Sequence, residues 1–109
     1  MQEFALIFRP TRAVEPEALP RRNAAARDWA LALRRDGNLH AASPLEDDGV
    51  VVSQDGVTPV ARDHAIASVL VIQAQSLESA VALAKGHPGL RFGTEIEIRP
   101  VKAAAPPPP

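Results

Sequence analysis

Cysteine and tyrosine are absent from this chain of 109 residues, and aromatic residues make up only 4% of it. Without cysteine there are no disulfides, thiolate nucleophiles or thiolate metal sites. Neither sign of charge is in excess, because 12 basic and 13 acidic residues give a net charge of -1. A chain with this balance has no long-range field that would draw it to nucleic acid or to an anionic membrane surface. We therefore expect neither kind of partner.

Long hydrophobic runs are also missing, since no apolar stretch approaches the ~18 residues that span a bilayer. The N-terminal residues Met1–Phe4 lack the basic and then apolar run of a signal peptide. These two absences predict a cytoplasmic protein. A hydrophobic content of 46% in 109 residues suits one globular domain. We assign that domain to residues 1–102, followed by a proline-rich disordered tail at 103–109.

Hydrophobic periodicity predicts a strand, a helix and a second strand in the first half of the chain. The apolar run at residues 3–9 ends at a proline, which cannot donate to a ladder, and is the first strand. A helix is expected from Pro20 or Asn23 to about Asp36, where basic residues and a glycine suit a helix C-terminus. Residues 39–43 then form the second strand.

The second half repeats this order after a β-rich insertion. The run Val50–Val52 and the pair Asp55-Gly56 predict a hairpin. Residues 65–74 are apolar on both alternating faces and predict a central strand. Ser76 is a good N-cap for a second helix, and residues 94–101 alternate charged residues with isoleucine as a half-exposed strand.

The order of elements predicts an α+β fold of the ferredoxin-like kind, βαβ-β-βαβ, with one antiparallel sheet. Right-handed crossovers place both helices on one face of that sheet. The first strand and the strand at 65–74 carry apolar side chains on both faces, so the face without helices needs a partner. We expect a two-fold homodimer that packs sheet on sheet.

Three stretches of the sequence fall in the order of a known family. They are EFALIFR at the start, RRDGNLHAASPL at the end of the Trp29 helix, and SLESAVALAKGHPGLRFGTEIEIRPV near the end of the chain. Over residues 2–102 the chain resembles the YCII-related proteins of the DGPF subgroup, as a divergent member. Asp55-Gly56 is followed by Val57-Thr58, where the Pro-Phe that names the subgroup would stand.

The resemblance implies a dimeric α/β barrel of two ferredoxin-like subunits with a cleft near the sheet. It also implies a regulatory setting beside alternative sigma factors, and it assigns no established reaction. In the other branch of the family a histidine and an aspartate are proposed to be catalytic. The histidine would fall near Ala26 in this sequence, so that half of the pair is missing. Asp47 or Asp48 lies near the place of the aspartate.

The expected topology also suggests a site, with Arg9, His40, Asp48 and His64 as candidate ligand-binding residues. The first two strands run parallel and the strand at 65–74 runs against them, so Arg9, the turn at 44–48 and His64 lie at one edge of the sheet. A histidine beside a carboxylate is the arrangement of a general base, which makes His64 and Asp48 the catalytic candidates. The alternative is that both are solvated loop residues. His40 is expected on a sheet face, either in the dimer cleft or as a hydrogen-bonded neighbour of the core.

No sequence motif indicates a cofactor or a metal. The three histidines are too far apart for a metal motif, and the glycines match neither G-x-G-x-x-G nor a P-loop. His87 receives no role, and Trp29 is interpreted as a core anchor. RNA recognition is disfavoured, because only Phe4 and Phe8 could stack on bases.

Two hypotheses for function remain at this stage. The first is a dimeric domain that binds a small molecule in a cleft of the barrel. The second is a cofactor-free enzyme that acts by His/Asp acid-base chemistry on a small organic acid or lactone.

Overall fold

The computed structural model describes residues 1–61 and 65–102 of the chain. Within these ranges the elements follow in the order β1 (Gln2–Pro10), η1 (Pro16–Ala18), α1 (Leu19–Arg35), β2 (Leu39–Pro44), β3 (Val50–Ser53), β4 (Gly56–Pro59), β5 (Ser68–Ala74), α2 (Leu77–Lys85), η3 (Pro88–Phe92) and β6 (Thr94–Pro100). The candidate His64 and the tail at 103–109 lie outside the described residues.

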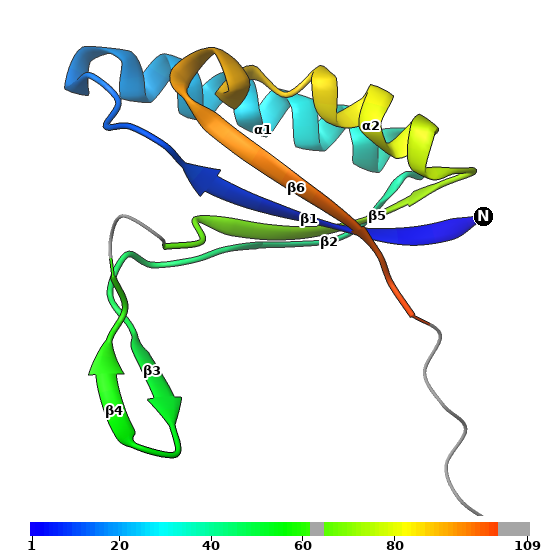
Figure 1. The fold of residues 1–109 in the computed structure, drawn as a ribbon. Helices are drawn as coiled ribbons and strands as arrows, with labels where there is room; N and C mark the ends of the chain where they lie inside the picture. Colours follow the sequence, from blue (N-terminus) through cyan, green and yellow to red (C-terminus); the bar gives the residue numbers. More distant parts are fainter. Residues whose placement is uncertain (62–64, 103–109) are drawn as a thin grey trace, which may run out of the picture.

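The main sheet has the strand order β2-β5-β1-β6, and each neighbouring pair is antiparallel. The two halves of the chain interleave, since β1 and β2 come from the first and β5 and β6 from the second. Helices α1 and α2 both cover the same face of this sheet (Figure 1). The prediction of an α+β, ferredoxin-like fold is confirmed, and β5 is a central strand as expected.

Local sequence signals set the helix ends. At the C-terminus of α1 the Asn38 N–H binds the Leu33 carbonyl at 2.9 Å and the Gly37 N–H binds the Arg34 carbonyl at 3.0 Å. This pair of bonds is a Schellman motif, and it requires the positive φ of +79° that Gly37 supplies. At the start of α2 the Ser76 hydroxyl accepts a hydrogen bond from the Ser79 N–H at 3.1 Å, which confirms Ser76 as the N-cap.

The hydrophobic core lies between the sheet and the two helices. Alternate residues of the two central strands are buried there: Phe4, Leu6 and Phe8 of β1 and Leu70, Ile72 and Ala74 of β5. The helices contribute mostly small side chains, including Ala80 and Ala84 of α2. Phe4 and Phe8 therefore lie on the helix side of the sheet, beneath α1 and α2.

The opposite face of the sheet carries no helix, and we call it the open face. Its centre is apolar and consists of Ala5, Ile7, Ala41, Val69 and Val71, which the strand register brings into adjacent rows. Charged and polar residues form its rim. In an antiparallel sheet, the face that is exposed to water normally carries polar side chains, whereas the centre of this face is apolar.

The hairpin of β3 and β4 projects from one end of the sheet, on the side away from the helices (Figure 1). Its register pairs Val50 with Pro59 and Val52 with Val57, so one face of this two-stranded ribbon is apolar throughout. All three valines on that face are more than half exposed. Within the described residues, β3 and β4 pair only with each other.

Three details differ from the sequence-based expectation. The hairpin turn consists of residues 54 and 55, and Gly56 is instead the first residue of β4, where its φ of +133° suits glycine. Strand β5 begins at Ser68 rather than at residue 65. The short helix η3, which the sequence did not predict, is closed by Gly93 at a φ of +89°.

Neither helix in the described part of the chain is long and apolar enough to cross a membrane.

Candidate functional site

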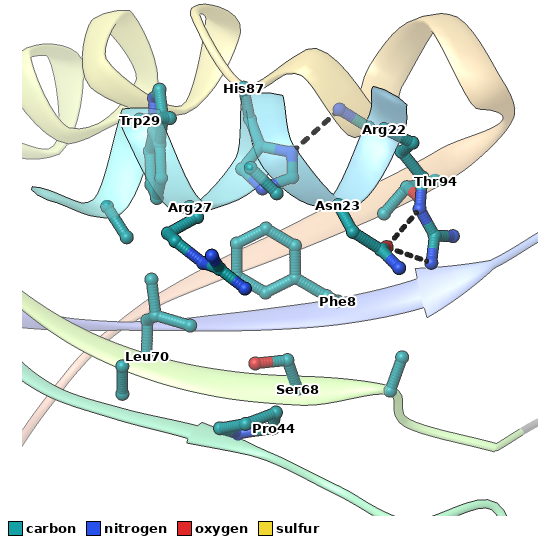
Figure 2. A pocket seen from close by; sticks show the side chains of 15 residues that line it. Phe8, Arg22, Asn23, Arg27, Trp29, Pro44, Ser68, Leu70, His87 and Thr94 are labelled. Carbon is teal, nitrogen blue, oxygen red and sulfur yellow. Dashed lines mark hydrogen bonds between the residues drawn. The ribbon is translucent and has the colours of Figure 1, made fainter. Parts of the chain in front are cut away.

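A cavity of about 530 Å³ lies on the helix side of the sheet, between the N-terminal half of α1 and the ends of β2 and β5 (Figure 2). The segment that joins α2 to β6 forms a third side. The described residues that line the cavity are Phe8, Arg22, Asn23, Ala26, Arg27, Trp29, Ala30, Ala42, Pro44, Ala67, Ser68, Leu70, His87, Gly89 and Thr94. A cavity of this size accommodates a small organic molecule.

Small side chains leave this space open. Helix α1 presents Ala26 and Ala30 to the cavity, and the sheet opposite presents Ala42 and Ser68. Further along the helix the larger Leu33 is buried in the core. The C-terminal half of α1 is thus packed on the sheet, while its N-terminal half lacks the side-chain volume to fill the gap.

Aromatic rings form one wall of the cavity. The His87 ring lies with its centroid 4.8 Å from that of Phe8 and 4.7 Å from that of Trp29, and Phe8 meets Trp29 edge to face at 6.5 Å. The Trp29 indole N–H donates to the Leu83 carbonyl at 3.3 Å, which ties α1 to α2. The three rings are inclined to one another by 55° to 77°, and together they form a largely apolar wall against which another ring can pack.

His87 is held in one orientation by the backbone that follows it. Its Nδ1 accepts a hydrogen bond from the Gly89 N–H at 2.9 Å, as the N-cap of η3. A Cβ at residue 89 would lie 2.9 Å from both Nδ1 and Cε1 of the ring, so this approach requires glycine. Because Nδ1 is the acceptor, the neutral ring carries its proton on Nε2.

The pKa of His87 is lowered to about 4, first because burial disfavours the imidazolium and second because the positive charge of Arg22 is close. The ring is therefore neutral at physiological pH. It has no acidic partner at this site, since none of the described residues that line the cavity is Asp or Glu. In this cavity His87 offers a ring for packing and an Nε2–H for hydrogen bonding. It does not form the His/Asp pair that a general base needs.

The neutral state of His87 predicts a pH dependence of stability. As the pH falls from about 6.5 to about 4, His87 in the unfolded chain takes up a proton while the folded ring does not, so protons favour unfolding in this window. We expect the free energy of unfolding to fall by about 1–2 kcal/mol between pH 7 and 4, after a reduction for the partial exposure of the ring. Urea unfolding at a series of pH values measures it.

His87→Asn is the matched control for this prediction. Asparagine offers an oxygen near the position of Nδ1, so it keeps the cap on the Gly89 N–H but does not titrate. All other groups are the same in the two proteins. We therefore expect the variant to lose the contribution of His87 to the pH dependence of the free energy of unfolding. Parallel pH profiles for His87→Asn and the wild type would contradict the assignment.

Two arginines of α1 give the cavity its charge. The Arg22 Nε and Nη2 both donate to the Asn23 Oδ1, at 3.1 and 2.9 Å, and the guanidinium of Arg27 also reaches the cavity (Figure 2). Within the described residues, neither arginine forms an ion pair. The polar side of the cavity is therefore cationic, and none of its described lining residues is a carboxylate.

Two of the residues predicted to bind a ligand lie on the open face, across the sheet from the cavity. Arg9 Nη1 forms an ion pair with Glu97 Oε1 at 2.7 Å. His40 Nδ1 lies 2.9 Å from Glu3 Oε2 and 3.3 Å from Gln73 Nε2. His40 thus lies on a sheet face, as expected, and whether it faces a dimer cleft stays a prediction.

The three predicted residues that the structure describes, Arg9, His40 and Asp48, do not form one cluster with the cavity. Arg9 ends β1, whereas His40 lies beside Glu3 near the start of that strand, about 20 Å away at the rise of a β-strand. Asp48 is in the exposed loop between β2 and β3, and His64 lies outside the described residues. Their roles in binding or catalysis remain predictions.

Sequence reasoning missed His87 and Arg22 as residues of the cavity. Available signals were the segment HPGLRFG, in which a histidine before Pro-Gly can cap a short helical turn, and the Arg21-Arg22 pair at the start of α1. Ala26, where the resemblance would put the family's histidine, does line the cavity. The chain thus has a histidine in this cavity, but it comes from the loop after α2.

No protein-family model matches the chain, and no curated protein matches it. Among solved structures, the fold is similar to that of 5-chloro-2-hydroxyhydroquinone dehydrochlorinase from Burkholderia phenoliruptrix AC1100, in its complex with 2,5-dihydroxybenzoquinone. The TM-score is 0.54 and the identity 17%, over 93% of this chain and 95% of that one. At this identity the likeness establishes a shared fold and no shared activity.

Proposed function

We propose that this protein is a small-molecule-binding domain, and that its ligand occupies the cavity between α1 and the ends of β2 and β5. The observation that carries the proposal is an open space of about 530 Å³ that combines an aromatic wall with converging polar groups. Ligand sites are typically concave and apolar, with a few polar groups that fix orientation. A dehydrochlorinase of the same fold in complex with 2,5-dihydroxybenzoquinone supports the idea that such a fold can hold a small cyclic compound.

Trp29 provides a direct readout of binding, because it is the single tryptophan of the chain and lines the cavity. In a ¹⁵N-labelled sample its indole N–H gives one cross-peak. We expect saturable shifts of that peak on titration with at least one of three probes: benzoate, phenol and 2,5-dihydroxybenzoquinone. If none of the three produces a saturable shift, the proposal is wrong.

A variant that fills the cavity makes the test specific. Ala26→Phe places a ring in the space and should reduce probe binding at least tenfold, since the volume that the probe needs is lost. Ala24→Phe lies on the exposed side of the same helix, does not line the cavity, and should bind as the wild type does. Equal loss in both variants would point to a general effect on α1 and would contradict binding in the cavity.

We also propose that two chains associate through the open face as a homodimer. The apolar centre of this face and the exposed apolar side of the β3–β4 hairpin are two surfaces that one chain leaves uncovered. Antiparallel sheets pack face to face about 10 Å apart, and the rim pairs Arg9–Glu97 and His40–Glu3 leave the centre free for such packing. Light scattering should give twice the chain mass of 11.6 kDa, and a value equal to one chain would refute the dimer.

Membership of the YCII-related family, in the DGPF subgroup, is part of the same proposal. It rests on the quoted segments and on the ferredoxin-like fold. The proposal extends to a regulatory setting beside an alternative sigma factor. It predicts that a neighbouring gene encodes such a factor, which the genome sequence around this gene would test.

A further inference from the structure

The cavity holds two guanidinium groups and no carboxylate among its described lining residues, which sets the charge of the ligand that it suits. His87 adds no positive charge, because its ring is neutral. Acidic groups of the same chain that form ion pairs in the described structure, such as Glu97 and Glu3, are on the other side of the sheet. An anion that enters the cavity would therefore meet uncompensated positive charge in a partly desolvated space.

The geometry of Arg22 points to a particular anion. Its Nε and Nη2, which form one edge of the guanidinium, both donate to the single Oδ1 of Asn23. This is the edge on which a carboxylate makes two parallel hydrogen bonds, one to each oxygen. Asn23 is exposed, so its neutral amide oxygen can turn out into water and give way to the stronger, charge-assisted pair.

The rest of the cavity suits a flat ring. Phe8, Trp29 and His87 form its aromatic wall, and the alanines at 26 and 30 leave the space opposite them empty. Figure 2 shows Arg22 and Asn23 beside this wall, at the end nearest Thr94. A ligand with a carboxylate attached directly to a planar ring would reach Arg22 with one end and the aromatic wall with the other.

From these contacts, and building on the proposed binding function, we infer that the cavity selects the anion of a small planar aromatic carboxylic acid. The carboxylate takes the Nε/Nη2 edge of Arg22 in place of the Asn23 amide, and the ring packs against Phe8, Trp29 and His87. The guanidinium of Arg27 adds to the electrostatic attraction for the carboxylate but does not form the two parallel hydrogen bonds.

The test compares benzoate with benzamide, which has nearly the same shape and no charge. At constant ionic strength and neutral pH, the indole cross-peak of Trp29 should report an affinity for benzoate at least about tenfold above that for benzamide. Arg22→Gln should abolish this preference, because it weakens benzoate binding at least about tenfold more than benzamide binding. Arg22→Lys keeps the charge but not the paired edge, so it should recover only part of the preference.

Arg34→Gln is the matched control, because Arg34 lies in the last turn of the same helix and does not line the cavity. It should bind both probes as the wild type does. Equal affinity for benzoate and benzamide, or a preference that survives in Arg22→Gln, would overturn the inference while the binding function stands. If none of benzoate, phenol and 2,5-dihydroxybenzoquinone shifts the Trp29 peak, the binding function itself fails.

Discussion

Replacing Leu6 with Ala is expected to lower the free energy of unfolding by about 3 kcal/mol, the largest effect on folding stability that we predict. Leu6 is fully buried in the middle of β1, between the sheet and the two helices. Its removal leaves a cavity enclosed by large side chains on neighbouring strands, including Leu70 and Ile98. For a small domain with a total stability of 5–15 kcal/mol, such a loss is a large fraction.

The adjacent residue Ile7 supplies the control for this prediction. It lies on the same strand but points to the open face, where it is only partly buried in a single chain. We expect Ile7→Ala to cost about 1 kcal/mol or less under conditions that keep the chain monomeric. Urea unfolding followed by circular dichroism at one fixed protein concentration compares the two. A greater cost for Ile7→Ala than for Leu6→Ala would contradict the assignment of the core to the helix side.

Val71→Lys is expected to convert the proposed dimer to single chains. Val71 lies at the centre of the open face, in register with Ala5 of β1 and Ala41 of β2. In a dimer that packs through this face, the substitution would bury an unpaired ammonium from each subunit, at a cost of about 3 kcal/mol or more. This corresponds to an association at least about 100-fold weaker. Light scattering over a range of protein concentrations measures the change.

Leu31→Lys is the control for the dimer, since it makes the same kind of change at a residue of α1 that is 53% exposed. It should keep the mass of the wild type. We expect Val71→Lys to fold as a single chain, because the lysine then lies in water. Circular dichroism checks that it does. A Val71→Lys protein that is folded and remains a dimer would show that the open face is not the interface.

The fold could be predicted from the sequence because its signals are local and repeated. Ser76 at the start of α2, Gly37 after α1 and the alternation of apolar residues in β1 each act over a few residues, and all agree with one topology. The bounds of the elements were predicted less accurately, by one residue at the hairpin turn and by three at the start of β5. Asp55-Gly56 is a strong turn pair, yet the register places Gly56 in β4.

The candidate site could not be predicted in the same way, because a cavity depends on what is missing between distant residues. Ala26 and Ala42 look like ordinary small residues in a helix and a strand, and only their opposition across the gap makes a space. His87 likewise looked like a loop residue, whereas its contacts with Phe8 and Trp29 join three segments of the chain. Reasoning from the expected strand topology instead favoured Arg9 and His40, which lie on the other face of the same sheet.

The insertion that carries β3 and β4 is a detour that the main sheet does not require. The chain leaves the sheet at Pro44 and returns at Ser68, and these two residues are paired with each other in the ladder between β2 and β5. A short turn could close the same ladder, and loop-closure entropy changes only slowly with length. A change in the length of the intervening stretch should therefore cost the main sheet little stability. Val57-Thr58, where the sequence departs from the motif of the family that it resembles, falls within this stretch.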